Sequence, residues 1–362
     1  MNISAEVAFL GLAKKDIKSM TLEEFMADFS GISSQKYRAK QIYQWIAKGI
    51  KSFDEMSNVP KLLRDKLSQI YEIPGFEIQD KRVSVDSTVK YLFKLHDGEC
   101  IESVVMKYKH GYSICVSTQA GCKMGCVFCQ TGKGGFSRNL LPSEMILQIE
   151  TAQRDLNIKI SNIVLMGMGE PLDNYENVVK FLKLVSAPEG LNIGMRHISL
   201  STCGVVDKIY DLAKENFQLT LSVSLHAPND SIRDRIMKIN RRWNVEELMK
   251  ACLHYSKVCG RRISFEYVMI KGVNDSVKCA SELADILKGM LCHVNLIPLN
   301  GNLSNGMEKS LKTDVYRFKN VLESKGITAT VRRTLAQDIE GACGQLKGVH
   351  IPKEVKSKNE IL

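Results

Sequence analysis

The first part of the chain repeats its apolar residues at helical spacing. Between residues 37 and 50 the apolar side chains fall on one face of a predicted helix, and Pro60 opens a second one. A further helix is expected after Thr21, because Glu24 follows it at the spacing of a capping box. We therefore predict a small helical accessory domain over residues 1–83.

From about residue 83 onward, apolar residues recur at every second position, which is typical of β-strands. Two alternating stretches flank the sequence His-Asp-Gly at residues 96–98, a good hairpin turn. A second turn is expected at residues 110–111, directly before another alternating stretch. We predict that residues 84–111 form a β-ribbon linker between the helical domain and the rest of the chain.

Strand and helix patterns alternate through the remaining sequence. Such repeated βα units favour a parallel sheet, and about six units are too few for a complete barrel of eight. The predicted fold class is therefore α/β, with a partial (β/α)6 barrel over residues 112–345 and a C-terminal tail at 346–362. The strands are predicted at residues 112–118, 160–166, 197–202, 219–226, 263–270, 292–298 and 327–332.

Polar residues recur at alternate positions of five of these strands, while the intervening positions are apolar. Residues of one parity share one side of a strand. Because helices outside must cover the apolar side, we expect the polar side to face a lumen that is open to a large polar ligand. A single strand with one solvated face would alternate in the same way. The prediction of a polar lumen therefore rests on the repetition of this pattern in five strands. The polar set is Ser113, Cys115, Ser117, His197, Ser199, Ser201, Ser222, Ser224, His226, Ser264, Glu266, His293 and Asn295.

Composition narrows the class of protein. No run of about 18 apolar residues occurs, so a membrane span is not expected, and the N-terminus lacks the pattern of a secretory signal. The 11 cysteines are odd in number and scattered, which indicates metal-binding or catalytic thiols in a reducing cytoplasm. The net charge of +10 favours a phosphate-rich partner, although many other proteins are mildly basic as well.

Three cysteines, Cys122, Cys126 and Cys129, stand at C-x3-C-x2-C spacing in a loop rich in Gly and Lys. Three thiolates so close together can hold an iron–sulfur cluster and leave one iron free for another ligand. Phe128, directly before the last cysteine, also fits the radical S-adenosylmethionine pattern C-x3-C-x-aromatic-C. Half of a zinc site and plain reduced thiols are the alternatives, but this chain offers only one C-x2-C pair.

Several candidate ligand-binding residues lie at or just beyond predicted strand ends, where parallel βα folds bind their ligands. The glycines of the sequence MGMGEP at 166–171 would let a ligand approach the backbone, although a tight turn explains them as well. Each residue alone is more often structural, but together they surround the mouth that holds the cysteine loop. The candidates for cofactor binding are Gly169, Glu170, Ser201, Ser224, Leu225, His226 and Asn300.

Two further cysteines occupy unusual positions. Cys115 belongs to the polar side of the strand that leads into the cysteine loop. Cys343 lies in the sequence Gly-Ala-Cys-Gly, a predicted loop after the last strand, where it can move to reach a site. The alternative for Cys343 is an ordinary exposed thiol.

The chain resembles the bacterial 23S ribosomal RNA adenine C2 methyltransferases, a family of radical S-adenosylmethionine (radical SAM) enzymes. Beyond the cluster cysteines, the resemblance spans nearly the whole chain and implies a radical SAM barrel. The matching motifs are CVSTQAGC at 115–122, GMGEPL at 167–172, LIPLN at 296–300, DIEGACGQL at 338–346, YRAKQI at 37–42 and SFDEM at 52–56.

The resemblance implies a reaction with two S-adenosylmethionine molecules per turnover. The first methylates Cys343, and the second binds the free iron of a 4Fe-4S cluster and yields a 5′-deoxyadenosyl radical that takes a hydrogen from this methyl group. The resulting carbon radical adds to C2 of adenine. Cys115 then helps to resolve the covalent adduct by proton removal and by attack on Cys343, so a disulfide between the two cysteines forms transiently. Glu102 matches the position assigned as proton acceptor, although a hairpin carboxylate is usually just solvated.

The implied substrates are an adenosine in the peptidyl-transferase region of 23S rRNA and, in many members, adenosine 37 of some tRNAs. An adenine in folded RNA has to leave its stack to reach a lumen, and the helical domain would grip RNA by shape. An external reductant such as flavodoxin or ferredoxin is expected, as is a cytoplasmic monomer without a membrane partner.

Two alternatives remain at this point. The related C8 methyltransferases of ribosomal antibiotic resistance share the cluster and thiol positions, but they usually carry alanine where this chain has Pro171. A non-catalytic iron–sulfur protein that binds RNA would need neither the Gly-Glu-Pro segment nor a mobile Cys343.

Overall fold

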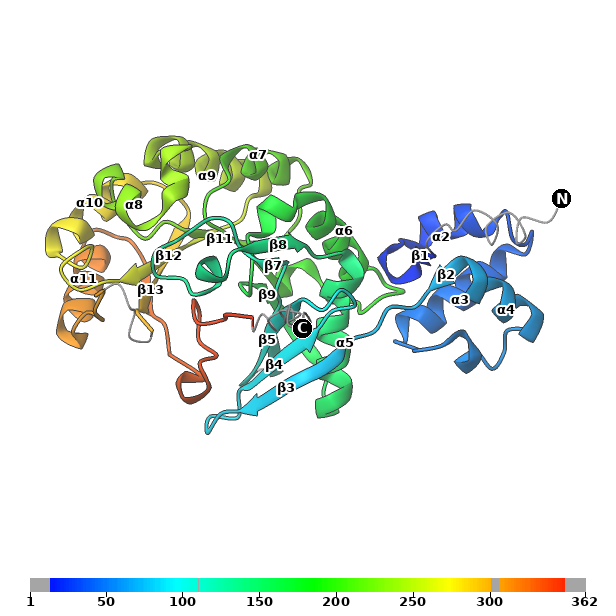
Figure 1. Ribbon diagram of the computed structural model, residues 1–362. Coiled ribbons are helices and arrows are strands. Elements are labelled where there is room, and N and C mark those ends of the chain that lie inside the picture. The colour runs from blue at the N-terminus through cyan, green and yellow to red at the C-terminus, as the bar shows by residue number, and fades with distance from the viewer. Residues whose placement is uncertain (1–13, 110, 301–305, 349–362) are drawn as a thin grey trace, which may run out of the picture.

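A single ten-stranded sheet organises the larger part of the molecule (Figure 1). The computed structural model describes residues 14–109, 111–300 and 306–348. The strand order is β14-β13-β12-β11-β10-β9-β6-β5-β4-β3. Within these residues β14 and β3 have no further partner, so the sheet curves without closing into a complete barrel. None of the helices described is long and apolar enough to cross a membrane.

Seven strands of this sheet run parallel to one another, and helices connect them. This arrangement confirms the predicted partial barrel of six βα units with a closing strand. The strands are β6 (Gly111–Cys115), β9 (Ile160–Leu165), β10 (Ile198–Thr202), β11 (Thr220–Ser224), β12 (Ile263–Met269), β13 (Cys292–Pro298) and β14 (Ala329–Val331).

The connecting helices lie on the convex side of the curved sheet (Figure 1). Their apolar faces and the apolar parity of the strands form one buried core, so the polar parity of β10 to β13 faces the concave side, as predicted. One of the helices, α8, was not expected from the sequence because it has only 7 residues. The helices are α5 (Pro142–Leu156), α6 (Tyr175–Ser186), α7 (Val206–Lys214), α8 (Asp230–Ile236), α9 (Val245–Cys259), α10 (Val277–Leu287) and α11 (Lys312–Ser324).

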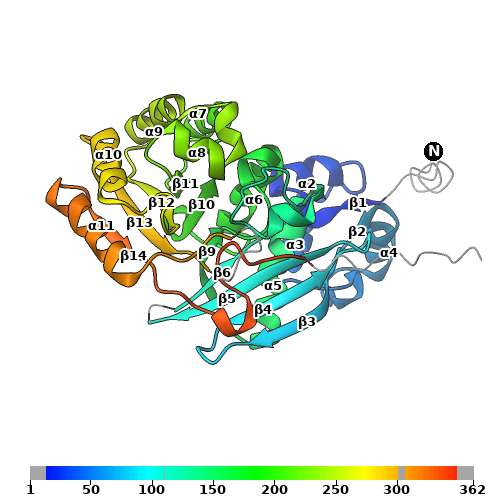
Figure 2. The same cartoon turned by 60° about the vertical axis from the view of Figure 1, so that its left-hand side comes forward.

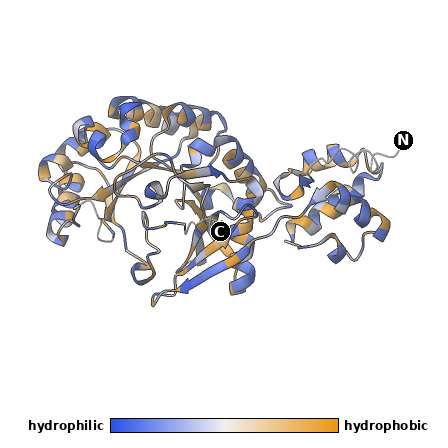
Figure 3. Cartoon of the chain, in the orientation of Figure 1, coloured by the Kyte–Doolittle hydropathy of each residue, from blue (hydrophilic) through white to orange (hydrophobic). Residues whose placement is uncertain are grey.

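An antiparallel ribbon extends the sheet beyond β6. It comprises β3 (Glu77–Val83), β4 (Val89–Lys94) and β5 (Cys100–Tyr108), which pair in sequence order. The expectation of helical structure up to residue 83 is therefore wrong for β3, whose exposed and mainly hydrophilic residues (Figure 3) carry no strong strand periodicity. The predicted ribbon linker is thus part of the main sheet, and of its second turn only Gly111 lies among the described residues.

The N-terminal helices form a separate small core. They are α2 (Leu22–Phe29), α3 (Lys36–Ala47) and α4 (Lys61–Ile70), and β1 (Lys15–Asp16) pairs with β2 (Tyr71–Glu72) beside them. Thr21 caps α2 as predicted, because its hydroxyl accepts a hydrogen bond from the Glu24 amide while the Glu24 carboxylate accepts one from the Thr21 amide.

A buried ion pair joins this helical domain to the sheet domain. Lys18 Nζ lies 2.7 Å from Glu150 Oε2 on α5, and the two side chains are 3% and 8% exposed. On the same side, the guanidinium of Arg154 donates to the carbonyl of Gly49. Such contacts fix where the helical domain sits relative to the barrel.

The C-terminal segment crosses the concave side of the sheet. Figure 2 shows it in red, passing over β5, β6 and β9. It includes a 3-10 turn, η7 (Gln337–Ile339), and then Cys343. Of the predicted tail 346–362, residues 349–362 lie outside the described part of the chain.

Candidate active site

The cysteine loop leaves the barrel after β6 and returns through a short hairpin of β7 (Gln119–Gly121) and β8 (Phe136–Asn139). Gly121, directly before Cys122, has φ of +79°, and a side chain there would collide with the carbonyl oxygen of Gly135. That carbonyl accepts a hydrogen bond from the Cys122 amide at 2.8 Å. The glycine therefore closes the loop tightly at its base.

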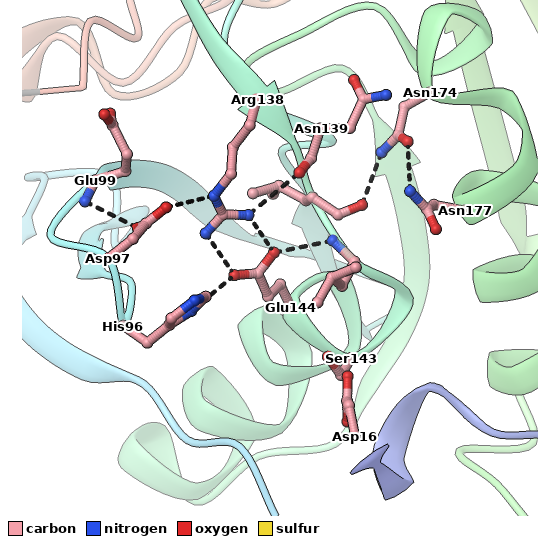
Figure 4. A network of polar contacts seen from close by, with 12 residues as sticks. Asp16, His96, Asp97, Glu99, Arg138, Asn139, Ser143, Glu144, Asn174 and Asn177 are labelled. Carbon is pink, nitrogen blue, oxygen red and sulfur yellow. Dashed lines mark hydrogen bonds and ion pairs between the residues drawn. The ribbon is translucent and has the colours of Figure 1, made fainter. Parts of the chain in front are cut away.

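Ion pairs anchor the returning strand β8 (Figure 4). The Arg138 guanidinium makes two hydrogen bonds of 2.8 Å to the Glu144 carboxylate at the start of α5, and it also bonds Asp97 in the β4–β5 turn. Planar arginine–carboxylate pairs of this kind fix geometry as well as charge. The cysteine loop is thus held to the ribbon and to α5.

Asn174 ties the two ends of the loop together (Figure 4). Its side-chain amide donates to the carbonyls of Thr118 and Leu140, both at 2.8 Å, and Asn177 in turn holds its oxygen. Thr118 precedes the loop and Leu140 follows it, so one buried amide fixes the width of the loop's neck.

Cys122, Cys126 and Cys129 line one cavity at the carboxyl ends of the strands, which we call the upper chamber. Its volume is about 170 Å³. Burial raises the thiol pKa of Cys122 to about 12 and also raises that of Cys126, with neighbouring cysteines adding to the effect. Other residues of the chamber include Gly169, Glu170, Ser201, Ser224, His226, Glu266, Arg332 and Cys343.

The donor set of the upper chamber fits an iron–sulfur cluster. Soft thiols suit iron–sulfur centres, and a cluster binds each thiolate through a different iron. Among the described residues no three His, Cys, Asp or Glu side chains converge as ligands of a single metal ion do. Cys122, Cys126 and Cys129 would therefore surround a cluster rather than converge on a single metal ion.

Gly169 and Glu170 follow β9 at the wall of the upper chamber. Gly169 has φ of +102°, and an added Cβ would lie 2.6 Å from Cβ of Gln119. The glycine is thus required by the neighbouring chain. Burial raises the pKa of the Glu170 carboxyl, although its oxygens accept hydrogen bonds from the amides of Cys203 (2.7 Å) and Leu172 (3.0 Å).

His226 presents a neutral imidazole to the upper chamber. Burial, together with the charge of Arg233, lowers its pKa to about 3. Nδ1 accepts a hydrogen bond of 3.0 Å from the Val268 amide, which leaves the proton on Nε2 as a donor. The ring also packs edge-on against Phe128 of the cysteine loop, with 4.8 Å between the ring centroids.

Ser201 and Ser224 line the upper chamber, whereas the Leu225 side chain is buried in the core. Both backbone groups of Leu225 already have protein partners, the Glu266 carbonyl and Arg233 Nε. Arg233 of α8 was not predicted as a site residue. It is a fully buried arginine that also donates to the carbonyls of Cys203 and Ser224. Arg233 therefore holds the ends of β10 and β11 in place.

Cys115 and Cys343 line a second cavity, which we call the thiol pocket. Both thiols are free. Burial and the neighbouring Cys343 raise the pKa of the Cys115 thiol to about 12. Asn300 also lines the thiol pocket. Its amide nitrogen lies 3.4 Å from the Cys343 carbonyl, and its buried side-chain oxygen has no hydrogen-bond partner among the described residues.

Arg332 and Glu266 are further site residues, and neither is among the predicted cofactor-binding residues. Arg332 lines both the thiol pocket and the upper chamber, and its guanidinium lies 3.9 Å from the Glu266 carboxylate. Glu266 also accepts hydrogen bonds from Asn295 (2.7 Å) and Ser264 (3.0 Å). The polar parity of β12 pointed to Glu266, whereas Arg332 stood out in the sequence only as a member of one of three adjacent arginine pairs.

Glu102 lies beside the end of the Cys343 segment and outside the lining of both cavities. It is buried, and one carboxylate oxygen accepts hydrogen bonds from the amides of Lys347 (2.6 Å) and Gly348 (3.2 Å). The other oxygen pairs with Lys90 Nζ at 3.0 Å. The alternative of an ordinary solvated hairpin carboxylate therefore does not apply to Glu102, whereas its role as proton acceptor stays a prediction.

A partial barrel with a three-cysteine loop at its mouth defines a radical SAM enzyme, which uses a 4Fe-4S cluster and S-adenosylmethionine. Residues 116–280 match the model of the Radical SAM superfamily. A crystal structure of a radical SAM methyltransferase from Sphaerobacter thermophilus shares 41% identity and a TM-score of 0.87 with this chain, covering 92% of it and 99% of the other chain.

The N-terminal domain shows to which family of radical SAM enzymes the chain belongs. Residues 15–73 match the model of the Ribosomal RNA large subunit methyltransferase N-terminal domain. Proteins of Thermoanaerobacter sp. and Clostridium novyi, both named "Probable dual-specificity RNA methyltransferase RlmN", are 52% and 51% identical to the chain, over 92% and 93% of its length and 97% and 99% of theirs. The chain belongs to the RlmN family of radical SAM methyltransferases.

Proposed function

We propose that this protein methylates C2 of an adenosine in the peptidyl-transferase region of 23S rRNA and of adenosine 37 in some tRNAs. The observation that carries the proposal is the placement of two free thiols, Cys115 and Cys343, in one pocket next to the chamber of the cluster cysteines. An electron carrier or a passive RNA-binding protein would not need this pair.

The target atom demands such chemistry. C2 of adenine is neither acidic nor usefully nucleophilic, so polar methyl transfer would fail there. Cys122, Cys126 and Cys129 would hold the cluster, which would supply the electron that converts S-adenosylmethionine into a hydrogen-abstracting radical. Two S-adenosylmethionine molecules are consumed per turnover, one as methyl donor and one as radical source.

Cys343 is the methyl carrier in this proposal. Its sulfur attacks the methyl group of S-adenosylmethionine, and the resulting thioether later loses one hydrogen atom from that methyl. The carbon radical adds to C2 and joins RNA to the enzyme covalently. After a proton and an electron have left the adduct, Cys115 loses its proton and attacks the Cys343 sulfur. The breaking S–C bond leaves its electron pair on the carbon, which takes up a proton to become the new methyl group. The disulfide that is left between Cys115 and Cys343 is reduced by an external thiol before the next turnover.

Several residues would assist the ligands of this reaction. Gly169, Glu170, Ser201, Ser224 and His226 line the upper chamber and would offer partners to the polar groups of S-adenosylmethionine there. The unpartnered oxygen of Asn300 offers an acceptor in the thiol pocket. Leu225 would make no side-chain contact with the ligand, because its side chain is buried in the core. Its backbone links Ser224 to His226.

Glu102 is the proposed proton acceptor for the adduct. Its carboxylate is occupied by Lys90 and by the amides of Lys347 and Gly348. The end of the Cys343 segment would therefore have to leave Glu102 before this carboxylate can take a proton. An external reductant such as flavodoxin or ferredoxin and a monomeric enzyme complete the proposal.

Mapping modified adenosines by mass spectrometry tests the substrate assignment. We expect 23S rRNA and tRNA from a deletion strain to lack methyl groups at C2 of adenosine, and the gene to restore them. Methylation at C8 instead would overturn the proposal in favour of the resistance-type reaction, against which Pro171 argues. Loss from rRNA alone would refute the tRNA part.

A further inference from the structure

A third cavity lies at the opposite end of the barrel lumen from the cysteine loop. We call it the lower chamber, and its volume is about 560 Å³. Pockets of this size hold small ligands or single building blocks of larger ones. Arg261 and Arg262, in the loop before β12, line this chamber. The other lining residues on β10 to β13 include Ser199, Thr220, Ser222, Ser264, His293 and Asn295.

The lower chamber is positively charged. Arg261, Arg262 and Arg332 line it, while Glu266 is its one carboxylate and is already held by Asn295, Ser264 and Arg332. Neither Arg261 nor Arg262 has a carboxylate within 4 Å among the described residues, and Arg261 Nε is buried without a hydrogen-bond partner. Two arginines without partners at the rim of a polar cavity favour an anionic ligand.

The lower chamber adjoins both cavities described above. Met166 and Arg332 line the lower chamber, the upper chamber and the thiol pocket alike. Val164 is shared by the lower chamber and the thiol pocket, and Glu266 by the lower and upper chambers. A ligand in the lower chamber therefore lies next to the thiols while the upper chamber stays free for S-adenosylmethionine.

We propose that the lower chamber binds the ribose-phosphate backbone of the RNA next to the target adenosine, with Arg261 and Arg262 contacting its phosphates. The base of that nucleotide then reaches the thiol pocket past Met166 and Arg332. This inference rests on the proposed function and specifies from which end of the lumen RNA enters. RNA enters at the amino ends of the strands, opposite the cysteine loop.

The double variant Arg261→Ala/Arg262→Ala tests the lower chamber. Removing the charge-assisted hydrogen bonds to phosphate should raise the KM for an RNA substrate at least about tenfold. The slope of log affinity against log salt concentration should fall by about 0.7 for each phosphate that the protein no longer neutralises. Methylation of Cys343 by S-adenosylmethionine needs no RNA and should proceed at the wild-type rate, as followed by protein mass spectrometry.

Two further variants sharpen the test. Arg261→Lys/Arg262→Lys keeps both charges and should retain most of the affinity and the salt slope. Arg241→Ala/Arg242→Ala removes another arginine pair, which is exposed and lines none of the three cavities, and should change KM less than threefold. A larger effect of this control pair would overturn the proposal, because RNA would then approach from the side of α8.

The outcomes separate the two proposals. Unchanged KM and salt slope in Arg261→Ala/Arg262→Ala refute the lower chamber as an RNA site while leaving the methyltransferase assignment intact. Competition by AMP as strong as by an RNA fragment would also overturn it, since the ligand would then be a free nucleotide. If the wild-type enzyme methylates Cys343 but no RNA, the proposed function itself fails.

Discussion

Glu102 holds the end of the segment that carries Cys343, and replacing it by glutamine should release that end. The Glu102 carboxylate accepts the amides of Lys347 and Gly348 at 2.6 and 3.2 Å and pairs with Lys90 at 3.0 Å. In Glu102→Gln one neutral oxygen remains as acceptor, and the buried ammonium of Lys90 loses its ionic partner. The Lys90 ammonium then keeps only its hydrogen bond of 3.3 Å to the backbone carbonyl of Glu340.

The size of the effect follows from the number of charged hydrogen bonds. Each contributes roughly 1.5–3 kcal/mol, and because glutamine keeps part of the interaction we expect docking of the segment to weaken by about 2–3 kcal/mol. That corresponds to a roughly 30- to 150-fold larger open population. Amide hydrogen exchange at Lys347 and Gly348 should accelerate by the same factor, since exchange requires opening.

Glu340→Gln provides a matched control. Glu340 pairs with Lys347 Nζ at 3.0 Å, but both side chains are more than half exposed, and surface pairs contribute at most about 1 kcal/mol. Exchange at the two amides should therefore rise less than about fivefold. Equal exchange in Glu102→Gln and in the wild type would show that this carboxylate does not hold the segment.

Three other variants test separate parts of the molecule. Cys343→Ala should abolish methylation of RNA while the visible absorption of the cluster persists, so full activity would refute its role as methyl carrier. Cys115→Ala should let a covalent enzyme–RNA adduct accumulate, and a denaturing gel without a shifted band would count against its role in release. Lys18→Met leaves the buried Glu150 carboxylate without a partner and should lower the free energy of unfolding in urea by about 3–5 kcal/mol, whereas Lys18→Met/Glu150→Leu should regain most of the loss. An additive double variant would exclude direct coupling of the pair.

The barrel was predictable because its signals repeat. Strand and helix patterns alternate six times, and the polar parity of β10 to β13 recurs in every strand, so one misjudged residue changes little. The strand β3 failed for the opposite reason. Its exposed positions carry mostly polar and charged residues, as an edge strand requires, and this pattern is not distinct from that of a helix surface or loop.

The site was predictable only where the chemistry is local in the sequence. The cysteine spacing and the Gly-Glu segment can be read from neighbouring residues, and both line the upper chamber. Arg233 and Arg332 act through contacts with residues that are distant in the sequence, such as Cys203 and Glu266. A single arginine gives no sign of these partners until the fold brings them together.

The positions of the two thiols explain how they can differ in role. Cys343 lines both the upper chamber and the thiol pocket, so its sulfur can meet S-adenosylmethionine on one side and adenine on the other without a long movement. Cys115 lines the thiol pocket alone, and its burial keeps the thiol pKa at about 12. A protonated thiol outside the upper chamber is a poor competitor for the methyl group. If Cys343 carries that group as proposed, Cys115 is protected from methylation until an adduct in the thiol pocket requires a second sulfur.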